Sequence, residues 1–214
     1  KNEQHDQSQH PETTETPADL RLRLTPAQRG IWYAQQLDPA NATYQIGQYL
    51  DVQGDVDPRL LSIALTKIVR DIDSISMRFR ADDEGPHAVR RRPEPTDDLL
   101  EVVDLRGEDV DAAFDTARAR MDTEMTTPRD IEGDELFGAI LFRLAGDRSL
   151  FFQRVHHIML DGYSAVIALH YLARVYTELD KRAPTGLLLR PLAGRVARTA
   201  AKTPSPFPSH HELL

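Results

Sequence analysis

Val155-His156-His157-Ile158-Met159-Leu160-Asp161-Gly162-Tyr163-Ser164 is the stretch of sequence that joins a predicted strand to the longest predicted helix. Successive side chains of a strand point to opposite faces, so only one of the two histidines can face a given cleft, and the other belongs to packing. The strand-to-helix turn also places backbone N–H groups of Gly162 and Tyr163 at a helix N-terminus, where developing negative charge is favoured. A neutral imidazole beside such groups is suited to acyl transfer.

The rest of the chain alternates further predicted helices and strands. Thr25-Pro26-Ala27-Gln28 combines a capping hydroxyl, proline at the first helical position and glutamine three residues after the cap, which predicts a helix to about Leu37. Asp57-Pro58 opens a second helix, and residues 108–125 form a third. We expect strands at residues 20–24, 44–52, 75–79, 87–92, 100–104, 136–144 and 149–157, the last two as a hairpin. Helices interleaved with a mixed sheet predict an α/β fold of the α+β layered type.

The two ends of the chain differ in composition from the middle. Residues 1–19 contain a single apolar residue, Ala18, and predict a flexible linker. The globular pattern covers residues 20–182, and residues 183–214 form a proline-rich connection. The sequence therefore predicts one folded unit between two tethers.

Composition excludes several classes of function. The net charge is −8, from 34 acidic and 26 basic side chains, and no basic stripe is concentrated anywhere, so we expect no nucleic acid partner. The chain has no cysteine, which excludes disulfides, thiolate nucleophiles and zinc–thiolate sites and fits a cytoplasmic location. We find no apolar run near ~20 residues and no signal peptide, so we expect no membrane partner. Adjacent histidines of a strand diverge, and we expect no metal site.

Three motifs in order resemble one family. His156-His157-Ile158-Met159-Leu160-Asp161-Gly162 matches the pattern HHxxxDG, Leu24 to Trp32 is similar to the first core motif of that family, and residues 70–79 occupy the place of the second. The chain resembles the N-terminal lobe of a condensation domain of nonribosomal peptide synthetases, in the chloramphenicol acetyltransferase-like superfamily. The resemblance implies a half-domain of that fold and formation of an amide bond.

The resemblance also implies roles for the residues of the HHxxxDG segment. His157 would be the catalytic residue, facing a tunnel where two thioesters meet on the phosphopantetheine arms of donor and acceptor carrier proteins. His156 would pack within the lobe, and Asp161 would hold the segment in place through a salt bridge to an arginine. Gly162 would permit close approach, with Tyr163 and Ser164 beside the substrate. The lobe itself would bind no cofactor.

The second motif departs from the family pattern RHExLRTxF, because Asp71 to Phe79 places Ser76 where the arginine belongs. A buried carboxylate at Asp161 needs a cation or several backbone donors. Arg78 lies two residues further along the same predicted strand and projects to the same face. We therefore predict that Arg78 pairs with Asp161, with Arg154 as the second candidate.

The chain corresponds to about half of a condensation domain, so its tunnel needs a second, C-terminal lobe, and residues 183–214 would lead toward it. We expect the isolated lobe to be inactive. Two other functions stay open: the lobe of an epimerization domain, which shares HHxxxDG, and a non-catalytic platform that docks carrier or partner proteins. The form of the first motif is similar to versions common in siderophore assembly lines.

Overall fold

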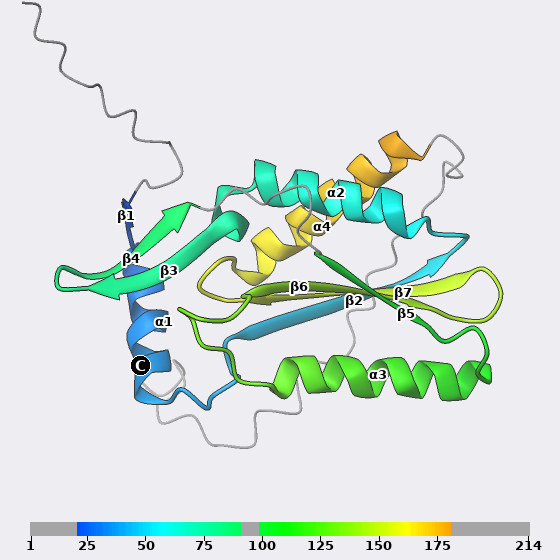
Figure 1. The fold of residues 1–214 in the computed structure, drawn as a ribbon, viewed down its shortest axis with the longest axis horizontal. Coiled ribbons are helices and arrows are strands. Elements are labelled where there is room, and N and C mark those ends of the chain that lie inside the picture. Colours follow the sequence, from blue (N-terminus) through cyan, green and yellow to red (C-terminus); the bar gives the residue numbers. More distant parts are fainter. Residues whose placement is uncertain (1–20, 91–98, 181–214) are drawn as a thin grey trace, which may run out of the picture.

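The computed structural model describes residues 21–90 and 99–180. The predicted linker at residues 1–19 and the predicted connection at residues 183–214 lie outside the described residues. Within the described ranges, Figure 1 shows a sheet with helices on both of its faces and a smaller sheet at one end.

A four-stranded sheet forms the centre of the lobe, in the order β2 (Gln45–Gln53), β7 (Arg148–His156), β6 (Phe137–Arg143) and β5 (Leu100–Asp104). β2 and β6 both pair antiparallel with β7, whereas β5 pairs parallel with β6. The predicted hairpin is thus confirmed, and Gly146 in its turn adopts a φ of 73°, which side chains other than glycine rarely adopt. The sheet is mixed, as the sequence predicts.

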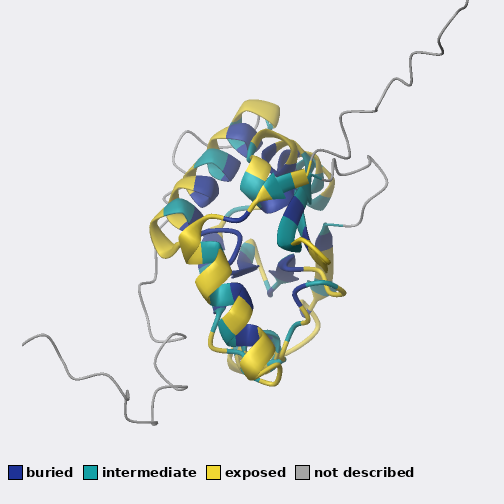
Figure 2. Ribbon diagram, turned by 90° about the vertical axis from the view of Figure 1, so that its left-hand side faces the viewer, coloured by how far each residue is buried: buried dark blue, intermediate teal, exposed yellow. Residues whose placement is uncertain are grey.

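Helices cover the two faces of this sheet (Figure 1), and buried and exposed residues alternate along them (Figure 2). The buried apolar side chains form two separate clusters. α2 (Pro58–Asp71) and α4 (Gly162–Leu179) pack on one face and α3 (Val110–Thr126) on the other. The faces follow strand alternation: Phe151 and Val155 of β7 point to α2 and α4, while Leu150 and Phe152 point to α3.

A second sheet was not predicted. β1 (Arg21–Arg23), β4 (Gly85–Arg90) and β3 (Met77–Asp82) form a three-stranded antiparallel sheet, and α1 (Pro26–Leu37) follows β1. The strand predicted at residues 75–79 begins only at Met77, because Asp73–Ser76 form the 3-10 turn η2. Trp32 of α1 and Phe79 of β3 belong to the same buried cluster as α2 and α4, so both sheets share one core.

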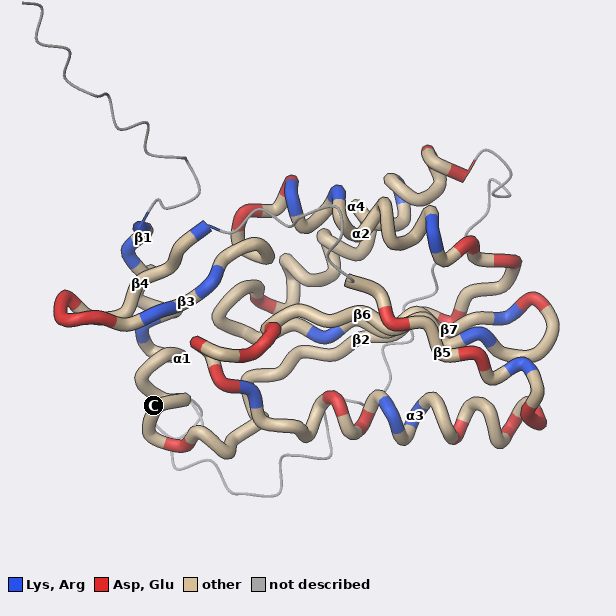
Figure 3. Tube along the Cα trace, viewed as in Figure 1, with Lys and Arg blue, Asp and Glu red and all other residues tan. Residues whose placement is uncertain are grey.

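Charged residues are interspersed rather than segregated, as Figure 3 shows along α3 and at the ends of the strands. None of the helices within residues 21–90 and 99–180 is both long and apolar enough to cross a membrane.

Candidate active site at the end of β7

The two histidines of the HHxxxDG segment have their backbone fixed from two directions. His156 is the last residue of β7, and its N–H donates to the carbonyl of Leu136 at 2.8 Å. The N–H of His157 donates to the carbonyl of Tyr44 at 2.7 Å. Leu136 directly precedes β6 and Tyr44 directly precedes β2, so the segment is tied to both neighbours of β7.

His156 belongs to the interior of the lobe, as predicted. It is 1% exposed, its ring lies 6.1 Å from that of Tyr44, and its Nδ1 accepts the N–H of Ile158 at 3.2 Å. Burial, with smaller contributions from His157 and Arg154, lowers the pKa of His156 to about 4. His156 is therefore neutral at pH 7, with its ring proton on Nε2.

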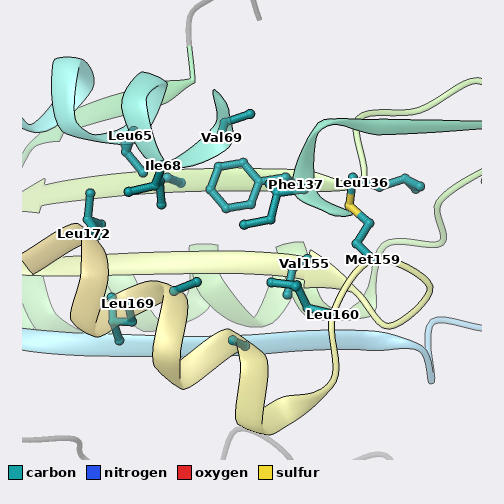
Figure 4. Close-up of a cluster of buried hydrophobic side chains, with 14 of the residues drawn as sticks. Leu65, Ile68, Val69, Leu136, Phe137, Val155, Met159, Leu160, Leu169 and Leu172 are labelled. Atoms are coloured by element: carbon teal, nitrogen blue, oxygen red, sulfur yellow. The ribbon is translucent and has the colours of Figure 1, made fainter. Parts of the chain in front are cut away.

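His157 is exposed, in contrast to its neighbour. The three residues after it are buried, and their contacts hold the turn that carries it: Ile158, Met159 and Leu160 all belong to the core under α4. Figure 4 shows Met159 and Leu160 directed into this core near Leu136 and Val155. The three residues between the histidines and Asp161 thus anchor the turn in the core, and the side chain of His157 remains on the surface.

Asp161 is the N-cap of α4, which begins at Gly162. Its Oδ1 accepts the N–H of Ser164 at 2.7 Å. The hydrogen bonds from the backbone and side chain of Ser164, together with the nearby His157, hold the pKa of Asp161 below its ordinary value. From the sequence, we expected the N–H groups at this helix N-terminus to stabilise the negative charge of an oxyanion. The carboxylate of Asp161 already occupies that N-terminus.

The prediction that Arg78 pairs with Asp161 is wrong for this structure. Arg78 forms its ion pair with Glu135, and Arg154 is paired with Glu124. The premise of the prediction also fails, since Asp161 is exposed and obtains its hydrogen bond from the helix that it caps. Ser76, at the arginine position of the second motif, is 5% exposed and its hydroxyl donates to the carbonyl of Asp73 at 2.9 Å.

Gly162, Tyr163 and Ser164 form the first turn of α4. Tyr163 is 77% exposed and Ser164 is half-buried, so Tyr163 is the more accessible of the two predicted substrate contacts. A Cβ added to Gly162 would meet no atom within 4 Å among the described residues. The described residues therefore leave space for a side chain at that position.

Gln28 connects the first motif to the HHxxxDG segment, a role that the sequence did not indicate. Its Oε1 accepts the N–H of Thr25 at 3.0 Å, which completes the predicted capping box, and its Nε2 donates to the carbonyl of Ile158 at 3.1 Å. Gln48 of β2 makes a similar bond from its Nε2 to the carbonyl of Ala165 at 3.1 Å. Two amide side chains thus fix the turn and the first turn of α4.

We expect Gln28→Glu to destabilise the lobe by about 1–2 kcal/mol, because a carboxylate keeps the capping bond but cannot donate to Ile158. An acidic residue near a helix N-terminus is otherwise favourable. Any loss of stability must therefore come from the lost hydrogen bond between the side chain of residue 28 and the carbonyl of Ile158. Urea unfolding of this chain measures the effect, with Thr25→Ala as the control that removes only the cap. Equal stability of Gln28→Glu and wild type would contradict the role assigned to the amide.

Comparison with known proteins assigns the chain to a family. The family model of the condensation domain matches residues 21–190, and the chain belongs to that family. It is 36% identical over 163 residues to a dimodular nonribosomal peptide synthase of Bacillus subtilis (strain 168), covering 76% of this chain and 7% of that protein. It is 30% identical over 165 residues to enterobactin synthase component F of Escherichia coli (strain K12), covering 77% of this chain and 12% of that protein.

Solved structures give the same result for the fold. The first condensation domain of the calcium-dependent antibiotic synthetase, in complex with a substrate analogue, matches with a TM-score of 0.69 and 35% identity, covering 79% of this chain and 42% of that one. The starter condensation domain of rhizomide synthetase matches with a TM-score of 0.69 and 29% identity, covering 75% and 38%. The chain thus spans less than half the length of these condensation domains.

Proposed function

We propose that this chain is the N-terminal lobe of a condensation domain that forms an amide bond between a carrier-bound acyl or peptidyl thioester and a carrier-bound amine. The observation that carries the proposal is the division between the two histidines: His156 is buried and neutral, while His157 is exposed on a turn fixed by backbone hydrogen bonds. An exposed imidazole on a rigid support can meet a substrate delivered from outside the lobe.

The proposed chemistry is attack of the acceptor amine on the donor thioester carbonyl. The new C–N bond forms a tetrahedral oxyanion, which collapses to the amide and releases the donor phosphopantetheine as a thiol. A free α-amino group has a pKa near ~8, so a fraction of it is already neutral at pH 7. His157 either takes the proton that becomes acidic as the bond forms or orients the amine, with Tyr163 and Ser164 beside it.

The partners follow from this chemistry. Both substrates arrive on the phosphopantetheine arms of carrier proteins, and a C-terminal lobe supplies the opposite wall of the tunnel. Apolar side chains in the first two turns of α4 are exposed, with Tyr163 at 77% and Ile167 at 51%, and such a surface suits contact with another domain. The absence of cysteine fits a reducing compartment, and we place the reaction in the cytoplasm.

We expect the isolated chain to form no amide, even with correctly loaded donor and acceptor carriers, whereas the complete condensation domain that contains it forms the amide. The reason is that one lobe provides only one wall of the tunnel, so the two thioesters are not brought together. Mass spectrometry of the acceptor carrier detects the product. Turnover by the isolated chain would contradict the two-lobe arrangement, and a folded, inactive complete domain would favour a docking platform. Exchange of the substrate α-proton for deuterium would instead indicate epimerization.

A further inference from the structure

Arg154 is a buried cation two residues before His156 in β7. It is 4% exposed, its Nε donates to Oε2 of Glu124 at 3.0 Å, and its Nη2 donates to the carbonyl of Glu135 at 3.2 Å. Its guanidinium therefore joins three segments: β7 itself, the C-terminal part of α3, and the residues just before β6. We call Arg154, Glu124 and the Glu135 carbonyl the arginine clamp.

The sheet around Arg154 is shaped to accept it. Gly47 of β2 and Gly138 of β6 both lie directly opposite Arg154, one on each side. A Cβ on Gly138 would lie 2.8 Å from Nη2 of Arg154, and a Cβ on Gly47 would lie 2.3 Å from Sδ of Met125 in α3. Both are closer than real contacts allow, so the two glycines let the guanidinium and α3 lie close against the sheet.

The carboxylate of Glu124 contacts three arginines. Arg129 lies 2.7 Å from the same Oε2 that Arg154 contacts, and Arg120 pairs with Oε1. Burial opposes ionisation of Glu124, yet the three arginines lower its pKa below the ordinary value. Glu124 therefore stays a carboxylate at neutral pH, and the clamp is a charge-assisted hydrogen bond rather than a neutral contact.

The clamp acts on the backbone that holds the histidines. Arg154 binds the carbonyl of Glu135, and the carbonyl of the next residue, Leu136, accepts the N–H of His156. A hollow of about 370 Å³, lined in part by Glu101, Glu135 and Arg154, lies beside this segment, so packing leaves it room to shift if the guanidinium is lost.

We propose that Arg154 is a positioning residue for His157, holding the end of β7 in register with the segment before β6 so that the exposed imidazole keeps one orientation. This proposal rests on the proposed function for its catalytic consequence. The consequence is specific: displacement of His157 lowers kcat, while KM for the carrier proteins stays unchanged, because Arg154 is buried and offers a carrier no surface.

Arg148 provides a matched control. It lies on the same strand and the same face, six residues before Arg154, and forms a bidentate pair with Asp51 at 2.8 and 2.6 Å. It also lies over the ring of Phe114 in α3, 5.8 Å from the ring centre. Its removal breaks an ion pair of the same face of β7, less buried than that of Arg154, at the end of the strand that is remote from the histidines.

The experiment compares Arg154→Met with Arg148→Met by two readouts. In this chain, amide hydrogen exchange at His156 and His157 should become at least ~10-fold faster in Arg154→Met, relative to the global change, and the imidazole NMR signals of His157 should shift. In the complete domain, kcat should fall by ~10-fold or more, since small displacements near a reacting centre are costly. Arg148→Met should leave both readouts within twofold of wild type.

Two further variants keep the test decisive if Arg154→Met does not fold. Arg154→Lys keeps the positive charge but cannot make both hydrogen bonds, to Glu124 and to the carbonyl of Glu135, in the same geometry. Glu124→Gln keeps a hydrogen-bond acceptor but removes the negative charge. Both should show the same selective exchange in weaker form, and unchanged exchange in both would overturn the proposal. Equal changes in the Arg154 and Arg148 variants would also overturn it. A selective exchange effect in a complete domain that forms no amide would support the clamp and overturn the proposed function alone.

Discussion

His157→Ala is expected to lower amide formation by the complete condensation domain at least ~10²-fold, with the fold intact. Positioned proton transfer contributes ~10²–10⁴-fold in enzymes, and orientation contributes comparably. His157 is exposed and makes its described backbone bond through its N–H, so removal of the imidazole leaves the turn and α4 in place. Amide formation is measured by mass spectrometry with loaded carriers, and circular dichroism checks the fold.

A second substitution separates the two roles that His157 can have. Glutamine can donate a hydrogen bond and orient the amine, but it cannot take up a proton at neutral pH. Activity retained by His157→Gln would assign an orienting role, and a loss equal to that of His157→Ala would assign proton transfer. Equal, small losses in His156→Ala and His157→Ala would instead remove His157 from the catalytic role altogether.

Much of the fold follows from local signals in the sequence. The capping box at Thr25 to Gln28, the hairpin around Gly146 and the helix after Gly162 all appear where their residue patterns place them. The two histidines divide between core and surface as the sequence predicts, but for another reason: β7 is buried on both faces and ends at His156, and His157 lies on the turn that follows. These features depend on neighbours within a few residues, which is why a single sequence contains them.

The features that the sequence did not predict depend on contacts between distant segments. Arg78 lies on β3, which belongs to the second sheet, and nothing in the alternation of residues 75–79 indicates which sheet the strand joins. The pairing of Arg154 with Glu124 brings β7 against α3 across 30 residues of chain. The role of Asp161 was available, however, because aspartate is a preferred N-cap and Ser164 follows at the right spacing.

The buried neutral state of His156 should make the stability of the lobe depend on pH. Its pKa is about 4 in the folded chain, against 6.5 in the unfolded chain. Protonation therefore favours the unfolded state, and the contribution of His156 to stability is complete above pH 6.5 and is lost as the pH falls toward 4. A difference of this size corresponds to about 3 kcal/mol, at 1.36 kcal/mol for each pH unit.

The contribution of His156 can be separated from that of the carboxylates, which titrate in the same range, by comparing wild type with His156→Asn. The Oδ1 of asparagine can take the place of Nδ1 as acceptor of the Ile158 N–H, so the variant keeps the turn and loses only the titration and part of the ring packing. Urea unfolding of this chain between pH 4.5 and 7.5 should show that wild type loses about 2–3 kcal/mol more than His156→Asn as the pH falls. Parallel stability curves for wild type and His156→Asn would mean that His156 takes up its proton in the folded lobe as readily as in the unfolded chain, contrary to its burial.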